Sequence, residues 1–242
     1  MAKRFDFHSH ILPGIDDGSK SVEESITMLR MEAEQGIDCV VATPHFYADY
    51  DSPQRFLDRR ARALERLQEA REQNPGLPEI KIGAEVYFYS GISDSDAIAE
   101  LTIAKKRCIL IEMPFGKWTD SMYRELEGIY TKQGLTPVIA HVDRYIGPFR
   151  TFGIPERLAE LPVIVQANAE FFLRRSTSAM ALRMLRDGKI HLLGSDAHNL
   201  RDRKPNLGEA LDLIEKRLGT APLEQMHALA GDVLYGFRTV AQ

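Results

Sequence analysis

The sequence predicts an α/β protein built around a parallel β-sheet. Seven short apolar runs, rich in β-branched side chains, are typical of buried strands. They cover residues 4–7, 39–43, 80–86, 108–113, 136–141, 163–168 and 190–196. Helical patterns separate many of these runs, and strands that alternate with helices indicate parallel pairing. Periodicity leaves two arrangements open, a closed barrel and an open, doubly wound sheet.

The first predicted helix follows residue 21. Ser21 and Glu24 have the spacing of a capping box, which satisfies free backbone N–H groups at a helix start. One apolar face follows, made of Val22, Ile26, Leu29 and Ala33. Gly36 suits the end of this helix, because glycine tolerates the left-handed conformation that often closes a helix.

Four more segments have helical patterns. Ser52 and Pro53 open a helix in which Leu57, Leu64 and Leu67 face one way. Residues 120–134 and 207–219 form further helices, and the helix around 154–161 is short. The chain has no internal linker, repeat or low-complexity segment, so we expect a single domain over residues 1–242.

Composition excludes several classes of protein. A hydrophobic fraction of 44% and a charged fraction of 27% are typical of a globular protein with a sizeable core. Lys plus Arg total 31 against 35 for Asp plus Glu, which gives a net charge of -4. The sequence has no stripe of basic residues that could follow the phosphate backbone of a nucleic acid. The N-terminus has no apolar signal region, and no run reaches the roughly 18 apolar residues of a membrane span. We therefore expect a cytoplasmic protein that is not embedded in a membrane.

The two cysteines do not suit nucleophilic catalysis. Cys39 and Cys108 each lie inside an apolar run, where a buried, inert thiol is expected. Cysteine-dependent phosphatases place an arginine six residues after the cysteine, whereas here those positions hold His45 and Pro114. That phosphate-binding loop is absent.

Metal-ligand side chains follow the predicted strands one after another. Five of the seven histidines lie at strand ends, together with several carboxylates. In chain order the set is His8, His10, Asp16 or Asp17, His45, Glu85, Glu112, His141, Asp196 and His198. The sixth strand ends at Asn168 and offers no obvious ligand. His191 and His227 lie outside the pattern, and we expect structural roles for them.

This series predicts a metal centre. One histidine at a strand end is more often a hydrogen-bonded structural residue, and one aspartate or glutamate is as often a solvated strand end or a turn cap. The carboxyl ends of parallel strands meet at one edge, however, so the whole series would converge. Imidazole and carboxylate groups bind zinc, manganese and iron, and nine of them exceed the needs of one ion. Two or three metal ions in one site are expected.

The ordered motifs resemble those of a known superfamily. "DFHSH", "DDG", "TPH", "GAEVY", "IEM", "PVIAHVDRY" and "GSDAHN" are similar to the motif series of the PHP (polymerase and histidinol phosphatase) superfamily. More closely, the chain resembles bacterial capsule and exopolysaccharide tyrosine phosphatases of the CpsB/YwqE type, from Phe5 to about Asn199. The resemblance implies a distorted seven-stranded, TIM-like (β/α)7 barrel and metal-dependent protein-tyrosine-phosphatase activity.

The resemblance also implies roles for individual residues. Three divalent ions would be bound, most often manganese, with iron, zinc, cobalt and magnesium as alternatives. His8, His10, Glu85 and Asp196 would hold the first ion. Asp17, His45 and His198 would hold the second, with Asp17 preferred to Asp16 because its position matches the family ligand. Glu85 would bridge to a third ion held by Glu112 and His141.

Two arginines complete the implied site. Arg144 and Arg203 follow ligand-bearing strands, where a planar guanidinium suits two phosphate oxygens, and Arg201 is a weaker competitor. An isolated arginine is usually a surface ion-pair partner. The loop 46–51, "FYADYD", is aromatic and acidic where some relatives are basic, so peptide preference does not transfer.

These inferences predict hydrolysis of phosphotyrosine by a metal-activated hydroxide, without a cysteine nucleophile. The expected partner is a phosphotyrosine-containing protein, such as a bacterial tyrosine kinase of polysaccharide assembly. The alternative enzyme is a small-molecule phosphomonoesterase of the histidinol-phosphate type. A catalytically silent metal-binding docking module is the third interpretation, and it would predict the loss of ligands or arginines that are all present here.

Overall fold

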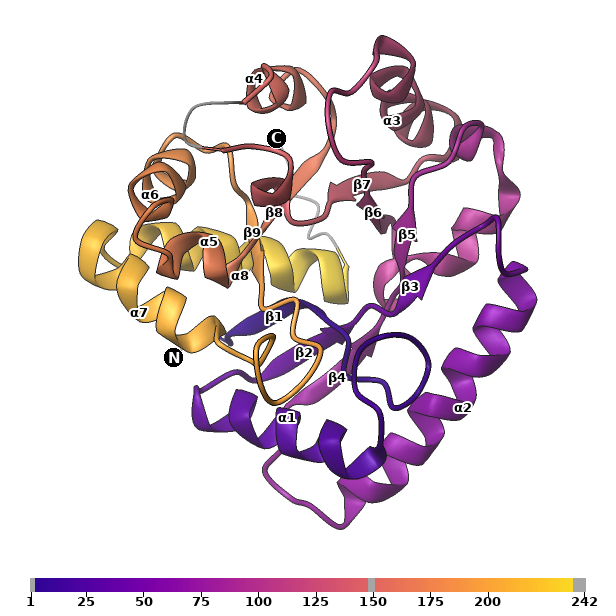
Figure 1. Ribbon diagram of the computed structural model, residues 1–242, viewed down its shortest axis with the longest axis vertical. Helices are drawn as coiled ribbons and strands as arrows, with labels where there is room; N and C mark the ends of the chain where they lie inside the picture. Colours follow the sequence, from indigo (N-terminus) through magenta and orange to yellow (C-terminus); the bar gives the residue numbers. More distant parts are fainter. Residues whose placement is uncertain (1–2, 148–150, 237–242) are drawn as a thin grey trace.

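Strands alternate with helices along most of the chain, and the helices lie outside the strands (Figure 1). The computed structural model describes residues 3–147 and 151–236. The strands are β1 (Phe5–Ser9), β2 (Cys39–Ala42), β3 (His45–Phe46), β4 (Glu79–Ile82), β5 (Glu85–Tyr87), β6 (Cys108–Glu112), β7 (Thr136–Ile139), β8 (Ile164–Asn168) and β9 (Leu192–Gly194). The helices are α1 (Val22–Glu34), α2 (Pro53–Glu72), α3 (Asp120–Gln133), α4 (Ile154–Leu158), α5 (Ala169–Leu173), α6 (Ser178–Arg186), α7 (Leu207–Leu218) and α8 (Ala221–Tyr235).

The strands form a parallel, curled sheet. One part has the order β1-β2-β4 and the other β3-β5-β6-β7-β8-β9, and every named pair is parallel. β1 also lies beside the segment that follows β9, because the Asp196 N–H donates to the His8 carbonyl at 2.8 Å and the His10 N–H donates to the Ala197 carbonyl at 2.9 Å. The predicted α/β class with parallel strands is confirmed, whereas closure with seven strands stays a prediction.

One predicted strand is divided in the structure, and another is followed by an unpredicted short strand. The run 39–43 is β2, which ends before Pro44, and β3 follows as a separate strand because Pro44 has no N–H to donate to a neighbouring strand. The run 80–86 continues as β4 and β5, separated at Gly83. A Cβ atom at Gly83 would lie 3.1 Å from Ile103 Cγ1, so a larger residue there would require the Ile103 side chain to shift. These breaks start β3 and β5 at His45 and Glu85.

The predicted helix starts are confirmed, with one difference in detail. Ser21 caps α1 by accepting from the Glu24 N–H, and Ser52 caps α2 in the same way. The Glu24 carboxylate accepts instead from the Lys20 N–H at 2.7 Å, so the capping box is displaced by one residue. α1 ends just before Gly36, whose φ of 74° is left-handed. The short helix predicted around 154–161 is α4.

Three helices of the structure, α5, α6 and α8, have no clear helical pattern in the sequence and were not predicted. α8 carries Pro222 in its first turn and Gly231 inside, which weaken the helical signal, yet it buries one face that includes Leu223, Met226 and Leu234. The core fills the space between the sheet and the helices and contains Phe7, Phe46 and other fully buried side chains. Among the helices of the described residues, none is long and apolar enough to cross a membrane.

Candidate metal centre

The nine predicted ligands converge at the carboxyl-terminal edge of the sheet. Each of them has a nitrogen or carboxylate oxygen within 3.7 Å of such an atom in another member of the set. All but Asp17 are buried or nearly buried. Their side chains come from loops and strand ends that are far apart in the sequence. The expected convergence is therefore confirmed as geometry, and their roles as ligands remain a proposal.

Two histidines of β1 face one carboxylate. His8 Nε2 lies 3.1 Å from His10 Nε2, and Glu85 Oε2 lies 3.2 Å from both nitrogens. Asp196 Oδ1 lies 3.6 Å from His8 Nε2 and 3.5 Å from His10 Nε2. His8, His10 and Glu85 thus place three donor atoms around one point, with Asp196 Oδ1 beside the two imidazoles, and such a donor set suits a divalent ion.

A second group lies on the more open side. Asp17 Oδ1 is 3.5 Å from His45 Nε2 and 3.4 Å from His198 Nε2. Together with His10, these residues place one donor atom each within 4.8 Å of one another. Asp17 is the exposed member, with 63% of its side chain accessible, so this group is open to solvent.

Glu85 extends the cluster to a third group. Its Oε1 lies 2.7 Å from His141 Nε2, and its Oε2 lies 3.1 Å from His45 Nδ1. Glu112 completes the group, with Oε1 3.7 Å from His141 Nε2 and Oε2 3.7 Å from His45 Nδ1. Glu85 therefore touches four imidazoles and is the central residue of the cluster.

The cluster contains buried polar atoms that lack a hydrogen bond. They are His45 Nδ1, Glu85 Oε2, His141 Nδ1 and His198 Nε2. Buried polar atoms are normally satisfied, so a concentration of such atoms at one place needs an explanation. Divalent ions would satisfy those that point into the cluster, since imidazole nitrogen and carboxylate oxygen are their preferred donors. The residues present therefore fit a metal centre.

Part of the cluster has the protonation that metal binding requires, whereas His8 and His10 would have to lose a proton: burial opposes their ionisation, but the carboxylates beside them raise the pKa of His8 and raise that of His10 to about 10. Burial lowers the pKa of His45 to about 4, and burial lowers the pKa of His198 as well. Burial opposes ionisation of Glu85, but its histidine neighbours, His8 first, hold its pKa well below the usual range. Neutral imidazoles and ionised carboxylates are the forms that bind metal ions.

Strained backbone fixes two of the predicted ligands. His141 has a φ of 31° and Asp196 a φ of 53°, in a region that few residues other than glycine adopt. Such strain persists where the surroundings over-determine it, and it is common at functional sites. Gly194 lets β9 approach β1 closely, because a Cβ atom there would lie 2.5 Å from the Cβ atom of His8.

Polar residues outside the cluster orient its histidines. The Asp16 carboxylate lies 2.8 Å from His10 Nδ1 and accepts from the His45 N–H at 3.0 Å. Gln166 Oε1 lies 3.3 Å from His8 Nδ1 and accepts from the His141 N–H at 2.6 Å. The contacts at Nδ1 leave the Nε2 atoms of His8 and His10 facing Glu85. This arrangement is typical of metal-binding histidines.

β8 provides no predicted ligand, but its polar side chains hydrogen-bond to residues of the cluster. The Gln166 side-chain amide donates to Asn168 Oδ1 at 3.2 Å, and the Asn168 amide donates to Asp196 Oδ2 at 3.0 Å. These roles were not predicted. The available indication in the sequence is that two polar residues occupy alternate positions of an otherwise apolar run. Asp6 was missed too: its carboxylate accepts from the Ser195 N–H at 2.9 Å and joins β1 to the loop after β9.

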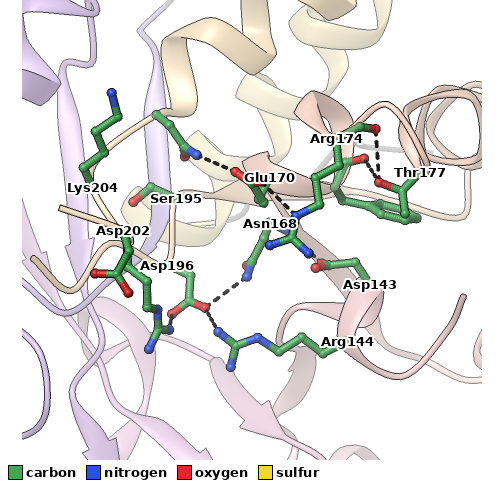
Figure 2. A pocket seen from close by; sticks show the side chains of 13 residues that line it. Asp143, Arg144, Asn168, Glu170, Arg174, Thr177, Ser195, Asp196, Asp202 and Lys204 are labelled. Carbon is green, nitrogen blue, oxygen red and sulfur yellow. Dashed lines mark hydrogen bonds and ion pairs between the residues drawn. The ribbon is translucent and has the colours of Figure 1, made fainter.

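Both predicted arginines reach the cluster. Arg144 pairs with Asp196 Oδ2 (Figure 2). Arg203 Nη2 lies 2.9 Å from Asp196 Oδ1. Arg203 Nη1 also lies 3.9 Å from Asp17. The competing Arg201 is exposed. A cavity of about 380 Å³ opens beside the two arginines toward α5 and also has Glu170 on its wall.

The remaining histidines and the cysteines lie elsewhere. His191 Nδ1 accepts from the Val165 N–H at 2.9 Å, and His227 packs against Phe5 with ring centroids 6.1 Å apart. These contacts fit the structural roles expected for both. Cys39 and Cys108 are fully buried free thiols, as predicted.

The fold and the cluster define a class: parallel α/β proteins that gather metal-ligand side chains at the carboxyl ends of their strands. Residues 4–232 match the family model described as "Capsular polysaccharide synthesis, CpsB/CapC". The chain belongs to the CpsB/CapC family.

Characterised relatives cover most of the chain. It is 29% identical over 223 residues to the tyrosine-protein phosphatase YwqE of Bacillus subtilis, an alignment that covers 89% of this chain and 85% of YwqE. It is 28% identical over 231 residues to the tyrosine-protein phosphatase CpsB of Streptococcus pneumoniae, covering 91% of this chain and 93% of CpsB. A solved structure from work on YwqE and CpsB as "unique metal-dependent tyrosine phosphatases" has a TM-score of 0.83 at 24% identity, covering 98% of this chain and 96% of the other.

A more distant fold relative is the phosphotriesterase homology protein of Escherichia coli. Its crystal structure, which holds phosphate in its active site, has a TM-score of 0.54 at 12% identity and covers 98% of this chain and 99% of that protein. This likeness concerns the fold.

Proposed function

We propose that this protein is a metal-dependent protein-tyrosine phosphatase. The observation that carries the proposal is the cluster of nine ligand-type side chains with two arginines at its edge. Family membership and relatives named as tyrosine-protein phosphatases support it. The substrate is a phosphotyrosine-containing protein of capsule or exopolysaccharide synthesis, and a tyrosine kinase of polysaccharide assembly is the leading candidate.

The proposed metal centre holds three divalent ions, with manganese as the preferred metal. His8, His10, Glu85 and Asp196 hold the first ion. Asp17, His45 and His198 hold the second, and His10 lies close enough to contribute. Glu85, Glu112 and His141 hold the third. When bound, these ions supply a hydroxide nucleophile at neutral pH and offset negative charge on the phosphoryl oxygens.

The residues of the chain orient the substrate. Arg144 and Arg203 hold the equatorial phosphoryl oxygens through planar, charge-assisted hydrogen bonds. Their guanidinium groups pair with the two carboxylate oxygens of Asp196, so both already lie at the edge of the cluster. Asp16, Gln166 and Asn168 keep the ligands in place while charge develops on the phosphoryl group. The tyrosine phenolate leaves readily because its pKa is near ~10.

The proposal extends to the arrangement of the whole chain. β2 with β3, and β4 with β5, each count as one interrupted strand of a distorted seven-stranded barrel in a single domain spanning residues 1–242. The contact between β1 and the segment after β9 supports closure. The cytoplasmic location expected from the sequence stays a prediction.

Replacing both cysteines should leave catalysis intact. Burial raises the pKa of Cys39 and of Cys108 to about 12, so neither forms a useful thiolate at neutral pH. We expect the Cys39→Ala/Cys108→Ala protein to lose roughly 0.5–3 kcal/mol of stability per site, with unchanged kcat in the folded fraction. Thermal melting and phosphotyrosyl-peptide kinetics measure the two effects. A covalent phosphocysteine trapped during turnover would contradict this prediction.

A direct assay tests the proposed function and its alternative. Purified protein with Mn²⁺ should hydrolyse a phosphotyrosyl peptide, a chelator should stop the reaction, and added Mn²⁺ should restore it. The ratio of kcat/KM for the peptide to that for histidinol phosphate distinguishes the protein phosphatase from the small-molecule phosphomonoesterase. A larger kcat/KM for histidinol phosphate would replace the proposed function by that alternative, and activity without metal would overturn the metal-dependent mechanism.

A further inference from the structure

Exposed aromatic side chains gather at the end of the molecule that carries the metal-ligand cluster. In the parts of the chain that the structure describes, seven large hydrophobic side chains are exposed, and five of them lie in loops that follow strands. These five are Tyr47, Tyr50, Phe115, Phe152 and Leu200, and ring contacts connect three of them, Tyr47, Tyr50 and Phe115, to the histidines of the cluster. Single exposed hydrophobic residues are normal, but three exposed rings beside one site indicate a binding surface.

The loop after β3 carries two of these side chains directly behind a predicted ligand. Tyr47 follows His45 by two residues, and their ring centroids lie 5.3 Å apart. The Tyr47 ring also packs 5.7 Å from Tyr87 of β5, which holds it in place. Tyr50 meets Tyr47 edge-on at 6.3 Å and is 83% exposed. The aromatic surface therefore begins at the metal-ligand cluster and extends outward.

The loop after β6 repeats this arrangement. Phe115 follows Glu112 by three residues and is 68% exposed. Its ring lies 6.1 Å from that of Tyr145, which in turn packs 5.6 Å from His141. The Tyr145 hydroxyl accepts from the Met113 N–H at 2.8 Å, so the ring under Phe115 is fixed. Phe115 is thus an exposed aromatic group on a rigid base beside the same cluster.

We propose that Tyr47, Tyr50 and Phe115 form a subsite for the aromatic ring of phosphotyrosine, and that this subsite favours aryl over alkyl phosphomonoesters. The inference rests on the proposed phosphatase function. One oxygen separates phosphorus from the ring in phosphotyrosine, so a phosphoryl group at the cluster leaves the ring in the layer just outside the ligands. Tyr47 and Phe115 occupy that layer, where a phosphoserine would place only a methylene group.

Binding of two phosphonates tests the subsite without catalysis. Benzylphosphonate, in which a methylene replaces the bridging oxygen of phosphotyrosine, and methylphosphonate have no ester bond to hydrolyse, and calorimetry on the Mn²⁺-loaded full chain gives both Kd values. We expect about tenfold tighter binding of the benzyl compound, because an aromatic pair and ring burial together reach roughly that factor. The Tyr50→Ala/Phe115→Ala protein should lose this preference, since neither side chain is in ring contact with a predicted ligand.

Three controls make the result specific. Tyr130→Ala removes a tyrosine of α3 that is 47% exposed, and it should keep the benzyl preference. Tyr47→Phe retains the ring next to His45 and should keep the preference as well. Metal content and thermal melting of the double variant should match the wild type, because its two substitutions lie on the surface.

Steady-state kinetics provide a second test of the subsite. The ratio of kcat/KM for a phosphotyrosyl peptide to that for a phosphoseryl peptide should fall about tenfold in the double variant. A wild type without benzyl preference, or a double variant that keeps it, would overturn the subsite. A benzyl preference that depends on Tyr50 and Phe115 in a protein that does not hydrolyse phosphotyrosine would uphold the subsite and overturn the proposed function.

Discussion

Glu85→Gln is expected to abolish phosphatase activity and to weaken metal binding at more than one position. The Glu85 carboxylate touches His8, His10, His45 and His141 at 2.7–3.2 Å, so it belongs to two of the three proposed metal groups. Glutamine keeps the shape but removes the negative charge and one acceptor oxygen. We expect kcat/KM to fall on the order of 10³-fold or more, beyond the ~10²–10³ that follows loss of one oriented donor.

Metal analysis alongside kinetics measures this effect. The variant should bind fewer Mn²⁺ ions per chain than the wild type at equal free metal. Glu79→Gln is a matched control, because Glu79 is a partly exposed residue of β4 that pairs with Lys81 at 2.6 Å, and it should retain wild-type metal content and kinetics. If Glu85→Gln bound a full complement of metal and turned over normally, Glu85 would not bridge the centre.

Much of this site could be predicted because of how parallel strands are ordered. The carboxyl ends of parallel strands meet at one edge, so polar side chains placed there, such as His45, Glu112 and Asp196, converge even though they are distant in the chain. The residue types then indicate the chemistry, since histidine and carboxylate together favour divalent metals. The pattern of strand ends therefore carried the prediction of a shared cluster.

The supporting residues were harder to predict. Asp16 and Asp17 are adjacent and chemically identical, and only side-chain geometry separates the partner of His10 from the neighbour of His198. Gln166 acts through the side chain of His8 and the backbone of His141, contacts that depend on how β8 packs against both. A strand pattern specifies neither the packing of side chains nor the curl of a sheet.

Local breaks in the strands were also absent from the pattern. The apolar run 80–86 continues through Gly83, so periodicity predicts one unbroken strand there, and the run 39–43 gives no sign of the second short strand that follows Pro44. In the structure the interruptions fall just before His45 and Glu85, which start new short strands at the site. Proline and glycine at these positions were the available signal.

Substitutions of Arg144 and His141 are expected to separate phosphate binding from metal binding. Arg144→Ala should lower kcat about 10²–10³-fold with metal content unchanged, because a guanidinium stabilises phosphoryl charge but does not ligate divalent ions. His141→Ala should lower both metal content and activity, since His141 Nε2 faces Glu85 at 2.7 Å. Arg144→Lys should recover only part of the loss, because an ammonium group cannot form two parallel hydrogen bonds.

Three measurements on the same preparations decide the role of Arg144: metal stoichiometry, kcat, and inhibition by inorganic phosphate. Arg186→Ala serves as the control, because Arg186 is an exposed residue of α6 that pairs with the adjacent Asp187 at 3.2 Å. Weaker phosphate inhibition in Arg144→Ala, at full metal occupancy, would place the guanidinium on the phosphoryl oxygens. Wild-type kinetics with full metal would instead make Arg144 a structural partner of Asp196, and Arg203 would then carry the phosphate contact alone.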